Sequence, residues 1–165
     1  MGVDQQFHTV RGYQLLNAEG KVLTSGMEDY LEMIYRICQE TGFVRVNQLA
    51  ERLNVRPSSA TKVVQRLSEL GLVEYEKYGS ISLSEQGKHL GEFLLSRHKT
   101  IQEFLGNLGI TEMLLQDTEL IEHDVSHSTL EYIKLFNQFF MDYPEIKKRY
   151  QQYLDHNLKQ RKLKK

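Results

Sequence analysis

The apolar residues of this chain change their spacing at Gly71, and this change constrains the fold most strongly. Before it, residues 27–41, 44–55 and 56–70 carry apolar side chains three and four positions apart, as on one face of a helix. After it, "LVEYEKYGSISLS" alternates on both sides of a central Tyr-Gly-Ser, which indicates two short strands joined by a tight turn. The sequence therefore predicts three helices followed by a two-stranded hairpin.

This order of elements is typical of a winged helix-turn-helix. The connection "NVR" between the second and third helices is short, as the motif requires, and we expect Val55 within it to be a buried core residue. The outward face of the third helix has no acidic residue before Glu69, and its hydroxyl, amide and basic groups suit DNA phosphates and base edges. A winged helix that contacts protein, or an ordinary surface helix, is the alternative. The predicted DNA-binding residues are Arg56, Pro57, Ser58, Ser59, Thr61, Lys62, Gln65 and Arg66, with Lys77 and Tyr78 on the hairpin.

Length and composition are those of an ordinary globular protein. The chain has 165 residues, of which 40% are hydrophobic and 26% are charged. It has no run of about 18 apolar residues, and its first residues lack the features of a secretory signal. Its single cysteine, Cys38, precludes an internal disulfide and fits a reducing compartment. We therefore expect a cytoplasmic protein with no membrane span.

The net charge of −1 conceals an uneven distribution along the chain. Residues 98–142 hold eight acidic residues against two basic ones, Lys99 and Lys134. Residues 145–165 reverse this balance, with eight bases against two acids. The acidic segment favours a bound cation, whereas the basic end suits either phosphates or a solvated helix that frays.

Three side chains of the acidic segment share one face of a predicted helix. Glu119, Glu122 and His123 stand at i, i+3 and i+4, within an arc of about 100° on an ideal helix. Asp117 and Asp124 point elsewhere, so the segment is not uniformly acidic on all sides. Three more candidates lie on other predicted helices: Asp29, Glu32 and His98.

Four carboxylates and two imidazoles make an oxygen-rich ligand set. Such a set suits Mn(II) or Fe(II) and could also bind Zn(II), Co(II) or Cd(II). The alternative is that these residues are exposed acids on solvated helices, because Glu-x-x-Glu-His also occurs by chance. Cys38 is nine residues from Asp29, on the opposite side of its helix, and is expected to pack in the core.

In four stretches the chain resembles the diphtheria toxin repressor family of bacterial metal-dependent repressors: "MEDYLEMIY", "VRVNQLAERLNVRPSSATKVVQRLSELGLVEYEKYGSISLSEQGKHLG", "SRHKTIQEFL" and "DTELIEHDVS". It looks most like the manganese transport regulator branch, over about Met27 to Phe140. The resemblance implies a homodimer that binds its operator when loaded with Mn(II), two ions per subunit, and represses metal-uptake genes. In that branch the ligands match Asp29, Glu32, His98, Glu119, Glu122 and His123.

Two of these positions distinguish the branches. Iron-responsive relatives carry methionine at the position of Asp29 and cysteine at the position of Glu119. Thioether and thiolate groups are soft ligands, whereas two carboxylates favour Mn(II) and permit a two-metal cluster. The resemblance therefore implies a manganese sensor, with an iron-responsive or broad-specificity repressor as the alternative.

The predicted fold class is mainly α, with an N-terminal winged helix-turn-helix followed by an all-helical dimerisation domain. We expect an N-terminal extension at 1–26, a DNA-binding domain at 27–90 and a metal-binding and dimerisation domain at 91–165. Metal is expected to join the first helix to the acidic helix and thereby to set the spacing of the dimer's two recognition helices. The rivals are an adaptor that binds no metal and a carboxylate-bridged two-metal enzyme. The enzyme has little support, because no nucleophile or base stands beside the ligand set.

Overall fold

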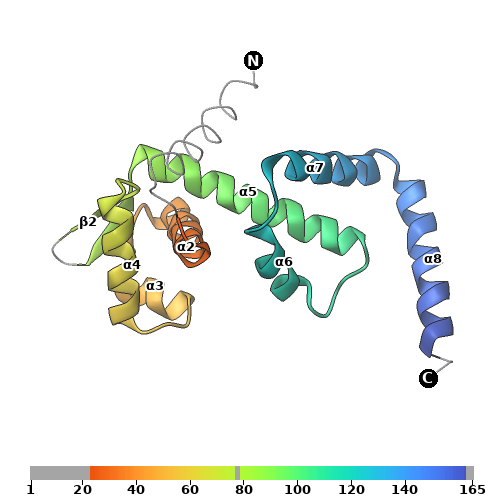
Figure 1. Cartoon of the computed structure of the whole chain (residues 1–165), viewed down its shortest axis with the longest axis horizontal. Helices are drawn as coiled ribbons and strands as arrows, with labels where there is room; N and C mark the ends of the chain where they lie inside the picture. The colour runs from red at the N-terminus through yellow and green to blue at the C-terminus, as the bar shows by residue number, and fades with distance from the viewer. Residues whose placement is uncertain (1–22, 77–78, 163–165) are drawn as a thin grey trace, which may run out of the picture. The chain divides into compact units, whose positions relative to one another are not determined.

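The computed structural model describes residues 23–76 and 79–162. The chain divides into two compact units, residues 1–95 and 96–165, and the division falls within the long helix α5, Glu85–Asn107 (Figure 1). Most of the extension expected at 1–26 lies outside the described residues. In the described part no helix is long and apolar enough to cross a membrane.

The first unit is a winged helix-turn-helix, as predicted (Figure 1). Its strands form one antiparallel sheet in the order β1-β3-β2, with Val44 opposite Ile81 and Val73 opposite Leu83. The strand β1 was not predicted, because two residues are too few to show an alternating pattern. In chain order the elements before α5 are α2 (Ser25–Thr41), β1 (Val44–Arg45), α3 (Val46–Arg52), α4 (Pro57–Glu69), β2 (Val73–Tyr75) and β3 (Ser80–Leu83).

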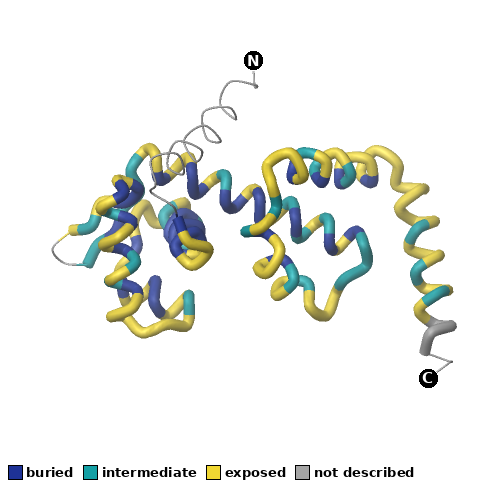
Figure 2. The backbone as a smooth tube through the Cα atoms, in the orientation of Figure 1, coloured by how far each residue is buried: buried dark blue, intermediate teal, exposed yellow. Residues whose placement is uncertain are grey.

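The core of the first unit is formed by the apolar faces that the helical spacing predicted. Every helix of the first unit and the sheet contribute to it, and its residues form one cluster. Figure 2 shows the buried positions of these elements in dark blue. This shared core holds α4 in a fixed orientation on α2 and α3, which leaves the opposite side of α4 in solvent. The fully buried members include Leu31, Ile34, Leu49, Val64, Leu67, Leu72 and Ile81.

The turn between α3 and α4 differs from the prediction at Val55, whose exposed fraction is 37%. Asn54 has a positive φ of 53°, and its N–H donates to the Glu51 carbonyl, while the Val55 N–H donates to the Ala50 carbonyl at 2.9 Å. This is the Schellman ending of a helix, with asparagine in the left-handed position. The expectation that Val55 is a buried core residue is wrong, because its backbone closes the helix while its side chain remains partly in solvent.

The base of the wing is joined to the start of α5 through Ser84. Its hydroxyl donates toward the Gly71 carbonyl at 2.7 Å and the Leu72 carbonyl at 3.1 Å, and it accepts from the Gly87 N–H at 3.0 Å. Gly87 is buried, and a Cβ at this position would overlap the Leu72 carbonyl oxygen. Glycine therefore permits the close approach of α5 to the strand that begins the wing.

The second unit contains the end of α5 and three further helices, α6 (Leu114–Glu122), α7 (His127–Asp142) and α8 (Pro144–Lys162). Phe104 of α5 packs edge-to-face on Phe136 of α7, and Phe140 of α7 contacts Tyr150 of α8. A buried amide pair joins α5 to α7, since the Asn107 side chain donates to Asn137 at 3.1 Å. The mainly helical fold class is thereby confirmed.

Candidate metal centre and DNA-binding surface

Three predicted ligands of the second unit lie together. His98 Nδ1 of α5 donates a hydrogen bond to Glu122 Oε2 at 3.0 Å, and His123 Nε2 lies 3.9 Å from Glu122 Oε1. Glu122 and His98 are both buried. A buried carboxylate flanked by two imidazoles offers the oxygen and nitrogen donors that divalent metals of this size range bind. The residues present therefore fit a metal site.

The C-terminal end of α6 explains why Glu122 and His123 share a face of this helix. The helix ends at Glu122, but His123 keeps helical backbone angles, φ −76° and ψ −24°, as its C-terminal cap. The arc predicted for Glu119, Glu122 and His123 therefore persists through the last residue. Glu119 lies one turn earlier and is exposed, so the structure brings it onto the same face without burying it.

Arg97 is an additional member of this cluster that the sequence argument missed. It is buried on α5, immediately before His98, and its Nη2 lies 3.3 Å from Nδ1 of His123. Arg97 lies one position before the acidic segment 98–142 and so was not considered with it. Its place next to the predicted ligand His98 is the feature of the sequence that could have indicated it.

The other two predicted ligands belong to the first unit and lie three residues apart on α2. Asp29 is exposed. Glu32 accepts from Arg36 Nε at 2.9 Å within the same helix. Both carboxylates are thus on one side of α2, and Glu32 has a cationic partner in Arg36.

The outward face of α4 carries the predicted DNA-binding groups. Pro57 begins the helix and Arg56 caps it. Ser58, Ser59, Lys62, Gln65 and Arg66 are exposed, and Thr61 is half-buried with its hydroxyl bonded to the Pro57 carbonyl at 2.9 Å. Lys77 and Tyr78 lie outside the described residues.

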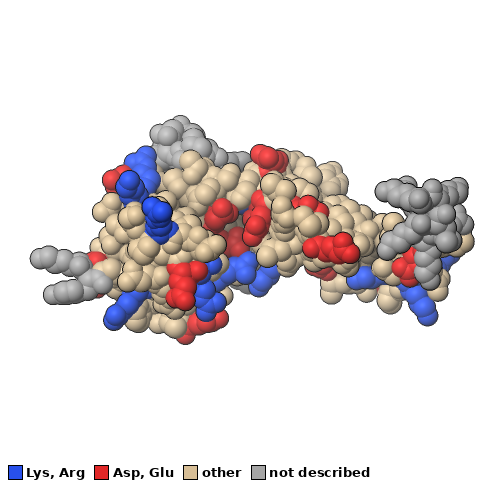
Figure 3. Space-filling model, turned by 90° about the horizontal axis from the view of Figure 1, so that it is seen from below, with Lys and Arg blue, Asp and Glu red and all other residues tan. Residues whose placement is uncertain are grey.

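One acidic residue modifies this face at its far end. Arg66 Nη1 lies 2.8 Å from Glu69 Oε2, and both side chains are more than half exposed. An exposed pair of this kind contributes about 0.2–1 kcal/mol, so Arg66 can leave it for a phosphate at little cost. Figure 3 shows basic and acidic side chains side by side on the surface seen from below, so attraction to DNA must come from particular faces and not from the overall charge.

Comparison with known proteins covers both units. Residues 22–81 match the family model of the iron dependent repressor N-terminal DNA binding domain. Residues 84–151 match that of the iron dependent repressor metal binding and dimerisation domain. The chain belongs to the iron dependent repressor family. Its resemblance to the diphtheria toxin repressors is thereby confirmed, and the family's role makes it a transcription regulator with a DNA-binding and a metal-binding, dimerising part.

Curated relatives point to one branch of this family. The chain is 41% identical over 120 residues to the HTH-type transcriptional regulator MntR of Oceanobacillus iheyensis, covering 72% of this chain and 82% of the relative. It is 40% identical over 126 residues to MntR of Bacillus velezensis, covering 76% and 89%. The relatives are transcription regulators, so the two-metal enzyme is excluded.

Solved structures of the family share the fold. The structure described as the manganese regulator SloR aligns with a TM-score of 0.62 at 29% identity, over 68% of this chain and 54% of that one. A manganese-dependent transcriptional repressor in complex with manganese aligns with a TM-score of 0.61 at 31% identity, over 68% and 53%. The chain thus spans about half the length of these solved chains.

The second unit of this family member has an extensive exposed apolar face. Tyr132, Leu135 and Phe139 recur at i, i+3 and i+7 on α7, and the first two have exposed fractions of 74% and 65%. Leu120 on α6 is 66% exposed. The three α7 side chains share one face of their helix, and exposed apolar side chains that lie together mark a surface that a partner covers. The matched family model includes dimerisation in its description.

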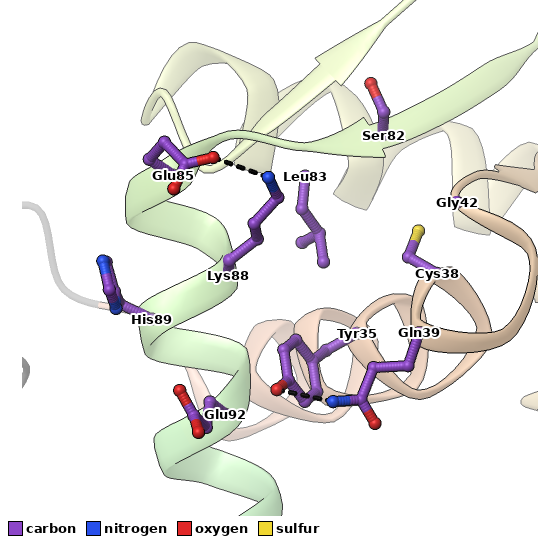
Figure 4. A pocket seen from close by; sticks show the side chains of 10 residues that line it. All are labelled: Tyr35, Cys38, Gln39, Gly42, Ser82, Leu83, Glu85, Lys88, His89 and Glu92. Carbon is purple, nitrogen blue, oxygen red and sulfur yellow. Dashed lines mark hydrogen bonds and ion pairs between the residues drawn. The ribbon is translucent and has the colours of Figure 1, made fainter.

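A cavity of about 570 Å³ opens in the first unit between α2, β3 and the start of α5 (Figure 4). Its wall includes Tyr35, whose hydroxyl accepts from Gln39 at 2.7 Å, and the Glu85–Lys88 ion pair at 2.6 Å. Cys38 also lines it, and burial raises the pKa of its thiol. Cys38 packs against the core, as predicted, while its sulfur faces this cavity.

Proposed function

We propose that the chain is a manganese-responsive repressor, which binds its operator as a metal-loaded homodimer and represses metal-uptake genes. The observation that carries the proposal is the cluster of His98, Glu122 and His123 in the unit that matches the family's metal-binding domain. The names of the curated relatives and of the solved manganese-dependent repressor support the choice of metal.

The proposed ligand set joins this cluster to carboxylates from two other places. Glu119 of α6 and the α2 residues Asp29 and Glu32 supply hard oxygen donors, and carboxylates at 29 and 119 favour Mn(II) over softer ions. Four carboxylates are enough to hold two ions per subunit by bridging. Fe(II), Co(II), Zn(II) and Cd(II) are other ions that this set could bind. The proposed metal ligands are Asp29, Glu32, His98, Glu119, Glu122 and His123.

The proposed regulation follows from the placement of these ligands in both units. An ion held by α2 and by the second unit would bind best to one arrangement of the chain, and so would shift the population towards it. In a homodimer formed through the second unit's apolar face, that arrangement sets the distance between two α4 helices. Operator half-sites about one or more helical turns apart would then be bound together.

Fluorescence anisotropy of labelled operator DNA tests the proposal. Wild-type protein should bind much more tightly with Mn(II) than without it, and Asp29→Ala and Glu119→Ala should remove most of that difference. Asp124→Ala is the matched control, because this exposed aspartate lies outside the ligand face. Equal affinity with and without Mn(II) in the wild type would refute the sensor.

A second candidate is an iron-responsive or broad-specificity repressor, favoured by the name of the matched family models. Anaerobic titration with Mn(II) and Fe(II), read out as operator affinity, separates the two. In the double variant Asp29→Met, Glu119→Cys the response should broaden towards Fe(II). An unchanged preference for Mn(II) would contradict the role given to these two carboxylates.

A further inference from the structure

The guanidinium of Arg97 lies inside the cluster that would hold the metal. It is buried with His98 and Glu122, and its Nη2 is 3.3 Å from His123 Nδ1 across 26 residues of sequence. A buried carboxylate such as Glu122 needs a cation or hydrogen-bond donors to balance its charge when no metal is bound, and Arg97 is a buried basic residue that contacts this cluster. All four residues belong to the second unit.

The chemistry of this contact defines the state of His123. A guanidinium has five N–H donors and no acceptor, so Nδ1 of His123 must be the acceptor. In a neutral imidazole one ring nitrogen accepts and the other carries the proton. The contact with Arg97 therefore requires the tautomer of His123 that carries its proton on Nε2.

Neither nitrogen of His123 can bind a metal ion while this contact persists. If the metal binds Nδ1, it takes the lone pair that the Arg97 N–H now occupies. If the metal binds Nε2, the proton moves to Nδ1, and two donors then face each other. The conflict does not depend on which nitrogen is the ligand.

We propose that Arg97 is an internal cation of the metal-free site, and that a metal ion must displace it from His123 to bind. The inference rests on the proposed function, since it assumes that His123 is a metal ligand. Arg97 balances Glu122 while the site lacks metal, and it opposes the incoming ion by both charge and hydrogen bonding. It thereby sets the metal concentration at which the site fills.

Mn(II) affinity of the metal-free full chain tests this, with free Mn(II) measured by its EPR signal. Arg97→Gln keeps an amide donor and removes the charge, and it should bind Mn(II) about tenfold more tightly or better. Lys99→Gln is the matched control, because it removes the same charge from an exposed position two residues away on α5. Its affinity should stay within about twofold of the wild type.

Glu122→Gln separates this inference from the proposed function. If the wild type binds Mn(II) no better than Glu122→Gln does, the proposed metal site itself fails. If Glu122→Gln loses binding but Arg97→Gln binds as weakly as the wild type, or more weakly, only the displacement of Arg97 is refuted.

Imidazole ¹⁵N chemical shifts of the metal-free wild type provide a measurement that does not depend on the folding of any Arg97 variant. The His123 signals, assigned by their loss in His123→Ala, should show an unprotonated Nδ1 and a protonated Nε2. Titration with diamagnetic Zn(II) should change this pattern as the ion enters. A proton on Nδ1 in the metal-free protein would overturn the inference.

Discussion

Gly87 provides a sharp test of how the wing is attached to α5. In Gly87→Ala the new Cβ would overlap the Leu72 carbonyl oxygen and lie 2.9 Å from the Leu72 carbonyl carbon and 3.3 Å from Leu83 Cδ2. The nearest atoms belong to the backbone, which cannot rotate away as a flexible side chain can. The first turn of α5 must therefore move off the start of the wing.

The size of the effect follows from these contacts. Alanine in place of glycine within a helix normally stabilises it by about 0.5–1 kcal/mol. Here an overpacking cost of about 1–3 kcal/mol opposes that gain. In the variant, the two hydrogen bonds from Ser84 to the Leu72 carbonyl, at 3.1 and 3.2 Å in the wild type, would also be strained. Each such bond contributes about 0.5–1.5 kcal/mol to stability. We expect the free energy of unfolding to fall by about 2 kcal/mol. For a domain the size of the first unit, residues 1–95, this lowers the unfolding midpoint by roughly 8–16 °C.

Thermal unfolding of the metal-free protein, followed by circular dichroism, measures this loss. Gly26→Ala is the control, because no atom lies within 4 Å of a Cβ built at Gly26 in α2 of the same unit. That variant should unfold at the wild-type temperature or slightly above it. A Gly87→Ala protein that unfolds no earlier than the wild type would refute the close approach of α5 to Leu72.

Three further predictions concern single side chains. Lys62→Ala should weaken DNA binding and reduce the slope of log affinity against log salt concentration by about one, as loss of one phosphate contact requires; an unchanged slope would remove Lys62 from the interface. Asn107→Leu should lower the free energy of unfolding in urea by about 1–3 kcal/mol, because it removes the donor to the buried Asn137 Oδ1. The double variant Asn107→Leu, Asn137→Leu should recover part of this loss; a double variant as unstable as the sum of the two single variants would argue against the pair. Because burial raises the pKa of Cys38, iodoacetamide should alkylate this thiol more slowly in the folded protein than in the urea-unfolded chain at pH 8. The two alkylation rates should approach each other as the pH rises through the pKa of the folded protein. Equal rates at pH 8, measured by mass spectrometry, would contradict the burial of Cys38.

Much of the fold could be predicted, because helices of ten or more residues repeat their apolar spacing often enough to be recognised. The strand β1 has only two residues and shows no period. Val55 was wrongly predicted to be buried, because an apolar residue next to a helix end can serve either the core or a Schellman turn. Hydrophobicity alone does not distinguish the two.

The candidate site was predictable where its members share a helix and unpredictable where they meet across the fold. Glu119, Glu122 and His123 are three and four residues apart, so helical geometry placed them on one face. The contact of Arg97 with His123 depends on how α5 packs against α6, and a separation of 26 residues leaves no trace in local spacing. For the same reason the bond from His98 to Glu122 could be expected from the family resemblance but not from the residues alone.

Asn54 has a consequence for engineering new operator preferences. Its left-handed backbone, with φ of 53°, ends α3 and directs the chain into α4, although its own side chain is not among the groups proposed to contact DNA. Asparagine and glycine tolerate this conformation, whereas a β-branched residue there would be strained. A randomised library at Ser58, Lys62, Gln65 and Arg66 should therefore keep position 54 restricted to Asn or Gly. Variation at 54 would change how α4 is presented before any base preference could be selected.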